Sequence, residues 1–417
     1  MKQVACSAFL SFLCFASLLN AWAGVAAPEK GLIAFNFACD ALSSAVFISP
    51  TNFYSDSAGY GFEPGGRVVA INGCITSADP FYFSVRLPEG NYRVIVSLGN
   101  SAAPSATTVK AELRRLMLYH IETVPGEYVG RSFVVNLRTP KIDGDGEVRL
   151  KSREKTDEWR DWDDKLTLEF DDAHPCIHTL MIQRVAVPTI YILGDSTVCD
   201  QPFEPWNSWG QMLPVFFKPM VAVANHAESG ETIADSLAGN RFKKVFSLMK
   251  SGDYLFIQFG HNDMKSKESD ALDHYKEDLT EVVKQTRAKG GTPVLVTSME
   301  RKAGVERPTL AGYPDAVREV AKQEHCALID LNVMSVAFYK ALGAQLDSAF
   351  VDGTHHDNYG SYELAKCVVE GIEQTRLPLS AYISDDFKPF DPGHPDPVAR
   401  FYMPASPGHS MVKPMGN

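Results

Sequence analysis

The chain has 417 residues, of which 45% are apolar and 22% charged, and its 40 Lys and Arg against 51 Asp and Glu give a net charge of −11. This composition excludes collagen-like, low-complexity and disordered chains, and the length suggests two or three domains. The negative charge disfavours a general nucleic-acid binder, which needs a basic face to neutralise phosphates. We therefore expect no nucleic acid among the partners.

The first residues predict export. Lys2 precedes an apolar run from Val4 to Leu19, and Ala21-Trp22-Ala23 places small residues at the −3 and −1 positions of a cleavage site. This pattern is typical of a signal peptide, here residues 1–23. No later segment approaches the roughly 20 apolar residues that span a bilayer. We expect an exported protein, periplasmic or extracellular, without a membrane span.

Six cysteines follow this predicted signal peptide, too few for a dense disulfide framework in so long a chain. The sequence is compatible with a Cys39–Cys74 disulfide and equally with buried free thiols. No CxxC pair is present, so we expect no structural zinc and no metal in the site.

Residues 28–187 predict an antiparallel β-sandwich. Short β-branched and aromatic runs alternate with turn clusters such as Pro88-Glu89-Gly90-Asn91, a pattern typical of sandwiches. The runs include residues 66–71, 81–85, 92–98 and 166–170. Asp143-Gly144-Asp145-Gly146 is interpreted as a hairpin turn, because it lacks the full ligand set of a calcium loop. The acidic and aromatic stretch 158–164 fits either a sugar-facing loop or the domain junction.

Residues 188–380 change to an α/β pattern. Five apolar strands are expected, at residues 189–193, 221–225, 254–259, 293–297 and 327–331. Between them, the spacing of apolar residues predicts amphipathic helices, one from Leu272 to Val283 and another from Leu310 to Val320. Such alternation favours a parallel sheet covered by helices. Residues 381–417 form a tail rich in Pro, Gly and Asp, for which an extended wrap and disorder both remain open.

Polar clusters follow three of the expected strands, and a fourth precedes the last helix. They are Gly194-Asp195-Ser196-Thr197, Asn225-His226-Ala227-Glu228-Ser229-Gly230, Gly260-His261-Asn262-Asp263 and Asp352-Gly353-Thr354-His355-His356. In open α/β sheets, ligands bind outside the carboxyl ends of the strands. Each motif alone is weak, since Gly-Asp-Ser is also a common turn, but together they predict one site.

The residue types in these clusters fill the roles of an acyl-transfer site. A serine hydroxyl needs a neighbouring base, which His355 can provide for Ser196. Asp352, three residues before His355, can orient the imidazole. The backbone N–H groups of Ser196 and Gly230 and the side-chain amide of Asn262 can stabilise an oxyanion.

The order Ser, Gly, Asn, His in these blocks resembles the SGNH (GDSL-type) hydrolase superfamily. This resemblance implies a flavodoxin-like α/β/α sandwich from about Thr189 to Arg376. The longer stretch from Gly194 through Trp206-Asn207-Ser208-Trp209-Gly210 is similar to rhamnogalacturonan acetylesterases, as are Gly260-His261-Asn262-Asp263 and Asp352-Gly353-Thr354-His355. Bacterial members often carry an N-terminal β-sandwich similar to galactose-binding modules. The resemblance implies an esterase that deacetylates pectin, without a cofactor.

The chain departs from these relatives in one motif. Where many of them have Gly-Arg-Ser, it has Gly230-Glu231-Thr232, which puts in doubt an anion contact at Glu231. The absence of GxSxG argues against the α/β-hydrolase fold.

Further residues beside the catalytic ones are candidates for substrate contact. We assign Asp195, Trp206, His261 and His356 to substrate binding, and expect Trp209 to be core rather than sugar-stacking. Four cations on loops at the same strand ends could neutralise galacturonate carboxylates: Lys265, Lys267, Arg301 and Lys302.

Three functions are thus compatible with the sequence. The first is a serine esterase that removes acetyl groups from a plant cell-wall polysaccharide, above all rhamnogalacturonan. The second is the same site acting on another ester, such as acetylxylan or a lipid. The third is a carbohydrate-binding protein with a degenerate esterase domain, against which the intact Ser196, Asp352 and His355 argue. The sequence leaves the oligomeric state open.

Overall fold

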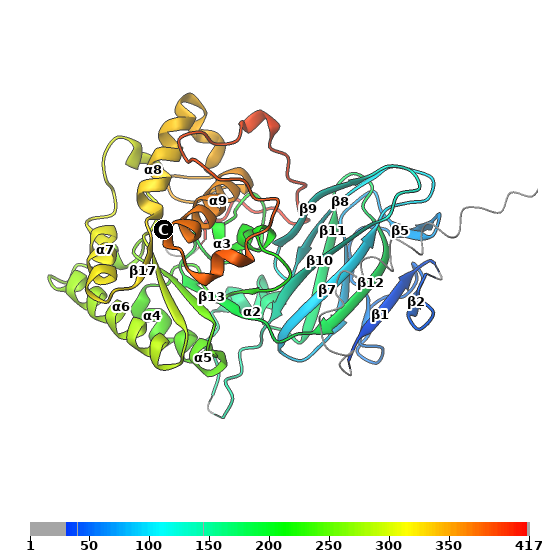
Figure 1. Ribbon diagram of the computed structural model, residues 1–417, viewed down its shortest axis with the longest axis horizontal. Coiled ribbons are helices and arrows are strands. Elements are labelled where there is room, and N and C mark those ends of the chain that lie inside the picture. The colour runs from blue at the N-terminus through cyan, green and yellow to red at the C-terminus, as the bar shows by residue number, and fades with distance from the viewer. Residues whose placement is uncertain (1–30, 40, 145, 415–417) are drawn as a thin grey trace, which may run out of the picture.

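The fold is taken from a computed structural model, which describes residues 31–39, 41–144 and 146–414. The predicted signal peptide, residues 1–23, lies outside the described residues. Two units lie side by side: a β-sandwich and a parallel sheet flanked by helices (Figure 1). No helix in the described part of the chain is long and apolar enough to cross a membrane.

Two mostly antiparallel sheets form the β-sandwich. One contains β10-β7-β12-β1-β2 in that order, with β5 paired to β12 and β4 to β5; the other contains β3-β6-β11-β8-β9. Their bounds are β1 Ile33–Phe37, β2 Val46–Ile48, β3 Tyr60–Phe62, β4 Val69–Ile71, β5 Cys74–Thr76, β6 Phe81–Arg86, β7 Gly90–Leu98, β8 Ser105–Ala111, β9 Arg115–Thr123, β10 Val129–Leu137, β11 Lys165–Asp171 and β12 Cys176–Arg184.

The core of the sandwich is aromatic. Phe83 contacts Phe35, Phe37 and Phe62 at ring-centroid distances of 5.0 to 5.3 Å, each edge to face. Edge-to-face contacts are favourable because the positive ring edge meets the negative ring face. These rings come from both sheets, so they join the two layers.

The second unit is a five-stranded parallel sheet of order β14-β13-β15-β16-β17. Since these are the second, first, third, fourth and fifth strands of the unit, this is the doubly wound order of flavodoxin-like folds. The strands are β13 Thr189–Gly194, β14 Ala222–Asn225, β15 Tyr254–Gln258, β16 Thr292–Val296 and β17 Ala327–Ile329. The α/β/α architecture predicted from the sequence is confirmed.

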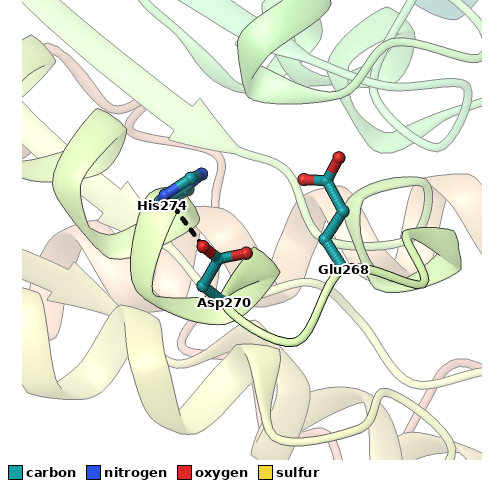
Figure 2. Close-up of side chains that lie close together, drawn as sticks. All are labelled: Glu268, Asp270 and His274. Carbon is teal, nitrogen blue, oxygen red and sulfur yellow. Dashed lines mark ion pairs between the residues drawn. The ribbon is translucent and has the colours of Figure 1, made fainter.

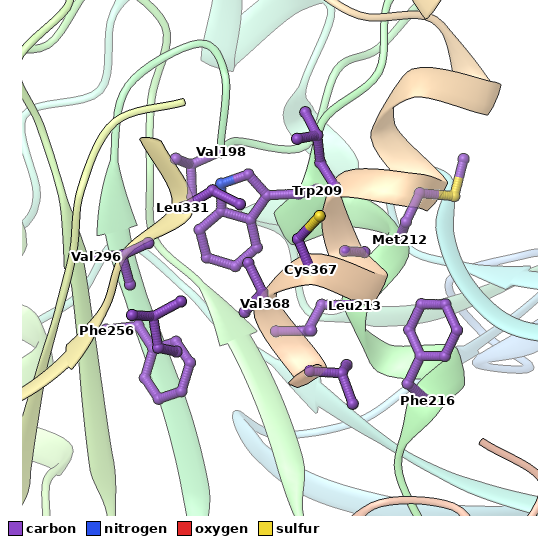
Figure 3. Packing of buried hydrophobic residues seen from close by; sticks show 14 of the residues in the cluster. Val198, Trp209, Met212, Leu213, Phe216, Phe256, Val296, Leu331, Cys367 and Val368 are labelled. Atoms are coloured by element: carbon purple, nitrogen blue, oxygen red, sulfur yellow. The ribbon is translucent and has the colours of Figure 1, made fainter. Parts of the chain in front are cut away.

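Helices cover both faces of this sheet. Successive residues of β13 alternate between two cores: Ile190 and Ile192 face one, Tyr191 and Leu193 the other. The first core is closed by α3 Trp209–Met212, α8 Leu331–Leu342 and α9 Asn358–Thr375; the second by α4 Ile233–Ala238, α5 Arg241–Leu248, α6 Ala271–Ala288 and α7 Tyr313–Gln323. Trp209 lies within the first core beside Cys367 and Val198, so its expected core role is confirmed (Figure 3).

The predicted elements recur with shifted ends. The strand expected at residues 66–71 shortens to β4, and α7 begins at Tyr313, with a proline in its first turn, so that Leu310 precedes the helix. Of the two alternatives left open for Cys74, a disulfide with Cys39 or a buried free thiol, the structure has the buried free thiol. Its Sγ and that of Cys176 each lie 3.6 Å from the Asn100 amide nitrogen. Both are free thiols in this structure.

The β-sandwich contributes buried residues to the second unit. Leu116 of β9 belongs to the first core of the parallel-sheet domain. Arg115, only 1% exposed, forms ion pairs with Asp200 at 3.2 Å and Asp161 at 3.4 Å. The stretch 158–164 therefore lies at the domain junction, where Trp162 also meets the His226 ring edge to face.

The C-terminal tail follows the same junction (red in Figure 1). Lys110 of β8 donates a hydrogen bond to the carbonyl of Pro404 at 2.8 Å, and Trp206 Nε1 donates one to the carbonyl of Ser410 at 2.7 Å. Up to residue 414, the tail is thus an extended segment held by both domains.

Candidate active site

Ser196, His355 and Asp352 form a hydrogen-bonded chain. His355 Nε2 lies 2.9 Å from Ser196 Oγ, and His355 Nδ1 lies 3.0 Å from Asp352 Oδ2. The carboxylate accepts the Nδ1 proton, so Nε2 is left to accept the serine proton. Ser196 follows β13, and the other two precede α9, so elements 156 residues apart meet here. This arrangement can carry out nucleophilic acyl transfer.

The Asp352 carboxyl is held in its ionised form. Burial alone would raise its pKa, but hydrogen bonds from the His355 side chain and from the N–H groups of Thr354 and His355 outweigh burial and lower the pKa below its usual range. Both N–H groups reach Oδ1 at 2.7 Å, while Oδ2 faces the imidazole. A carboxylate fixed in this way orients the ring and favours the imidazolium form during turnover.

Asp195 holds the turn that carries Ser196. Asp195 Oδ1 accepts hydrogen bonds from Thr197 N–H at 3.0 Å and Thr197 Oγ1 at 2.8 Å, and Oδ2 lies 3.3 Å from His261 Nδ1. His261 Nε2 in turn contacts the carbonyl of Met299 at 3.1 Å. Both residues are at most 1% exposed.

We expected Asp195 and His261 to bind substrate. The polar atoms of both side chains are engaged with Thr197, the Met299 carbonyl and each other, next to Ser196. These contacts favour a role in holding the nucleophile turn, and substrate contact by the two residues stays a prediction.

His356 and Trp206 are likewise buried. His356 Nε2 contacts the Tyr339 hydroxyl at 2.8 Å, and burial lowers its pKa to about 3, so it is a neutral core residue. This contact with Tyr339 favours a packing role, and substrate contact by His356 stays a prediction. Trp206 is 3% exposed and meets the His355 ring edge to face at 5.5 Å, so it packs beside the imidazole rather than offering an open face to a sugar.

The three expected oxyanion donors come from separate loops. Ser229 lies close to the nucleophile, because the Gln201 amide donates both to the Ser196 carbonyl at 2.8 Å and to Ser229 Oγ at 3.3 Å. Asn262 Nδ2 donates to the Glu231 carbonyl at 3.0 Å. Within residues 31–39, 41–144 and 146–414, no acceptor forms a hydrogen bond with the N–H of Ser196 or Gly230.

The orientation of the Asn262 amide is set by Lys265. Lys265 Nζ donates to Asn262 Oδ1 at 2.8 Å, which assigns the other end of the amide as the donor. Arg301 reaches the neighbouring His261 carbonyl at 3.2 Å. Of the four predicted loop cations, these two lie at the site, whereas Lys302 pairs with the exposed Asp347. Lys267 is exposed.

Sequence reasoning missed the residues that reach the site from outside the parallel-sheet domain. Lys151 Nζ donates to the Ser229 carbonyl, Arg114 Nη1 to the carbonyls of Gln201 and Trp206, and Lys413 Nζ lies 3.6 Å from Asp352 Oδ2. No local motif marks these cations, because their partners are distant in sequence.

In the part of the chain that the structure describes, two groups of acidic or histidine side chains lie close enough together to hold a cation. Glu268, Asp270 and His274 lie together at the start of α6, but they are exposed and already contain a His274–Asp270 pair at 3.5 Å (Figure 2). The buried group is Glu154, Glu158 and Glu228. Arg241 pairs with Glu154 at 2.6 Å, and Arg153 contacts Glu158 and lies 3.6 Å from Glu228, so two guanidinium groups already engage these carboxylates.

Comparison with known proteins places this geometry in a family. The GDSL-like lipase/acylhydrolase family model matches residues 192–361. The rhamnogalacturonan acetylesterase RhgT of Bacillus subtilis is 33% identical over 216 residues, which are 46% of this chain and 93% of RhgT. The chain belongs to the GDSL-like lipase/acylhydrolase family.

A further relative extends over both domains. The uncharacterized esterase YxiM of Bacillus subtilis is 28% identical over 404 residues, 90% of this chain and 98% of YxiM. A crystal structure of YxiM covers 84% of this chain and 99% of its own, with a TM-score of 0.46 and 24% identity. Family membership makes this chain a carboxylic ester hydrolase.

Proposed function

We propose that this GDSL-family hydrolase is a carbohydrate acetylesterase with Ser196 as nucleophile, His355 as general base and Asp352 as its orienting carboxylate. The observation that carries the proposal is the 2.9 Å contact between Ser196 Oγ and His355 Nε2, with Asp352 at 3.0 Å on the far side of the imidazole. The similarity to RhgT, a rhamnogalacturonan acetylesterase, supports acetyl as the acyl group.

The reaction follows from these positions. Ser196 Oγ attacks the acetyl carbonyl while His355 Nε2 takes its proton, and the N–H groups of Ser196 and Gly230 and the Asn262 amide stabilise the oxyanion. The imidazolium then protonates the departing sugar oxygen, which leaves an acetyl-serine. His355 next takes a proton from a water molecule, whose oxygen attacks the acetyl carbonyl. The imidazolium then returns the proton to Ser196 Oγ as acetate leaves.

The preferred substrate is an acetylated acidic glycan, rhamnogalacturonan first. Lys265 touches Asn262, Arg301 lies on the adjoining loop, and Lys413 lies 3.6 Å from Asp352. These cations gather at the site of a chain whose net charge is −11, so they could attract a carboxylate locally where the overall field would repel it. A neutral glycan such as acetylxylan carries no carboxylate for these cations to attract.

We also propose that the enzyme is exported, on the pattern of residues 1–23. Export would bring it to an extracellular polysaccharide. N-terminal sequencing of the secreted protein tests this, with Gly24 expected as the first residue.

The decisive assay compares acetate release from acetylated rhamnogalacturonan, acetylxylan and a short lipid ester. Wild type should release acetate fastest from rhamnogalacturonan, and Ser196→Ala should lose at least about 10³-fold in kcat on every ester, as expected for removal of the nucleophile. Equal rates on rhamnogalacturonan and acetylxylan would contradict the substrate assignment. Full activity of Ser196→Ala would contradict the mechanism, and binding of the glycans without any turnover would favour the degenerate-esterase alternative.

A further inference from the structure

Lys151 reaches the oxyanion loop from outside the parallel-sheet domain. It lies between β10 and β11 of the β-sandwich, immediately before the short helix α2 Ser152–Thr156. Its Nζ lies 2.6 Å from the Ser229 carbonyl oxygen and 2.6 Å from Glu231 Oε1. Its side chain is 28% exposed, so these charged contacts are partly shielded from water.

The carbonyl that Lys151 binds belongs to the same peptide unit as the Gly230 N–H. A trans peptide is planar, and its C=O and N–H point in opposite directions. A donor fixed on the Ser229 oxygen therefore fixes the direction of the Gly230 N–H on the other side. The positive charge also polarises the peptide, which makes that N–H a stronger donor.

Some contact must select one orientation of the Ser229–Gly230 peptide. Gly230 has a φ of +77°, a conformation that glycine adopts without strain, and a glycine permits other rotations of the peptide at little cost. If the peptide turned over, a carbonyl oxygen would face the site and repel the oxyanion. The Lys151 ammonium favours the orientation in which the oxygen faces away.

Lys151 is itself held at both ends by acidic residues. Its backbone N–H donates to Glu154 Oε2 at 2.7 Å, and the same oxygen pairs with Arg241 Nη2 at 2.6 Å. Arg241 Nε lies 3.8 Å from Glu231 Oε2, and Glu231 Oε1 binds Lys151 Nζ. The network thus closes on itself through two cations and two carboxylates.

This network also accounts for the departure at residue 231. Glu231 binds Lys151, a lysine supplied by the sandwich. Its side chain is 5% exposed and turned toward Lys151 and Arg241, so an anion contact there is replaced by an internal one.

We propose that Lys151 is a positioning residue of the esterase, which orients the Ser229–Gly230 peptide so that the Gly230 N–H serves the oxyanion. The inference rests on the proposed function of Ser196 and Gly230. It gives the β-sandwich a part in catalysis that is independent of whether the sandwich binds sugar.

The test compares Lys151→Met with Lys155→Met, which removes the same charge from an exposed position of the same helix segment. On p-nitrophenyl acetate, Lys151→Met should lower kcat roughly 10- to 100-fold, which is at most the loss expected when a whole oxyanion donor is removed. KM should change by less than about threefold. Lys155→Met should behave as wild type, and Lys151→Arg should recover part of the loss. Thermal unfolding of all variants identifies any loss caused by misfolding.

A crystal structure of Lys151→Met supplies a readout that does not require turnover, since the Ser229–Gly230 peptide should be rotated or occupy two orientations. A kcat within twofold of wild type, or a peptide that keeps its orientation, would overturn the proposal. p-Nitrophenyl acetate carries no sugar. If wild type hydrolyses it but releases no acetate from acetylated pectin, only the substrate assignment is refuted. A wild-type kcat in Lys151→Met would refute only the role of Lys151.

Discussion

The two domains contribute to the site in different ways. The parallel-sheet domain supplies the groups that would react: Ser196 after β13, Gly230 after β14, Asn262 after β15 and His355 before α9. The β-sandwich supplies cations that hold the intervening loops, such as Lys151 on the Ser229 carbonyl and Arg114 on the carbonyls of Gln201 and Trp206. The groups proposed to act on the ester thus come from one domain, while contacts from both domains hold the loops that carry them.

If this division holds, substitutions in the two domains should fail differently. A change in the triad should abolish turnover and leave the fold largely intact. A change in the inter-domain cations should have one of two effects. It should either lower stability and turnover together, or lower turnover alone by displacing a loop of the site.

The largest effect is expected for Asp352→Asn. The asparagine can still accept the N–H groups of Thr354 and His355 through one oxygen, but its NH₂ faces His355 Nδ1 and favours the wrong tautomer. We expect kcat on p-nitrophenyl acetate to fall by about 10³- to 10⁴-fold, as in other serine triads. Asp347→Asn, which changes an exposed carboxylate nearby, is the control and should keep wild-type kcat. A loss below tenfold in Asp352→Asn would mean that another group orients His355.

An intermediate effect is expected for Arg114→Met, on stability first. Arg114 Nη2 pairs with the buried Glu204 at 2.5 Å, and loss of one partner leaves the other charge buried. Breaking such a pair costs about 3 kcal/mol of unfolding free energy. Because the same guanidinium binds the Trp206 carbonyl and Trp206 packs on His355, kcat should also fall, by less than about tenfold.

The matched control for that variant is Arg86→Met in the same sandwich. Arg86 forms an exposed pair with Asp56, and exposed pairs contribute little, so the free energy of unfolding measured in urea should stay close to that of wild type. Equal destabilisation of the two variants would show that Arg114 does not link the domains energetically.

The contrast between the domains also separates what sequence could predict from what it could not. The α/β/α fold and the meeting of Ser196 with His355 were predictable, because strand ends converge at one edge and the Asp352–His355 spacing is local. Lys151 and Arg114 were not, because they lie in segments typical of solvated surface and their partners are 78 or more residues away. The contacts of Asp195 and His261 with the nucleophile turn were not predictable either, because adjacency to a motif does not tell on which side of the turn a side chain lies.

The smallest effect, and the one that isolates the Asp352 carboxylate, is a pH dependence of stability. The folded-state pKa of Asp352 is lowered, so the folded state binds its proton less readily than the unfolded state does. Its contribution to stability is then complete above the unfolded value of about 4 and is lost as pH falls through the folded pKa. The contribution is on the order of 1–2 kcal/mol, as for a hydrogen bond to a charged group.

Urea unfolding of wild type and Asp352→Asn between pH 3 and 6 measures this contribution. The variant should be less stable by that amount at pH 6, and the difference should shrink toward pH 3, because only the wild type loses a carboxylate by protonation. A difference that stays constant over this range would mean that the neutral hydrogen bonds of residue 352, rather than its charge, stabilise the turn before α9. The expected convergence would instead show that the charge which orients His355 also stabilises this turn. One group of the catalytic domain would then serve both the reaction and local stability.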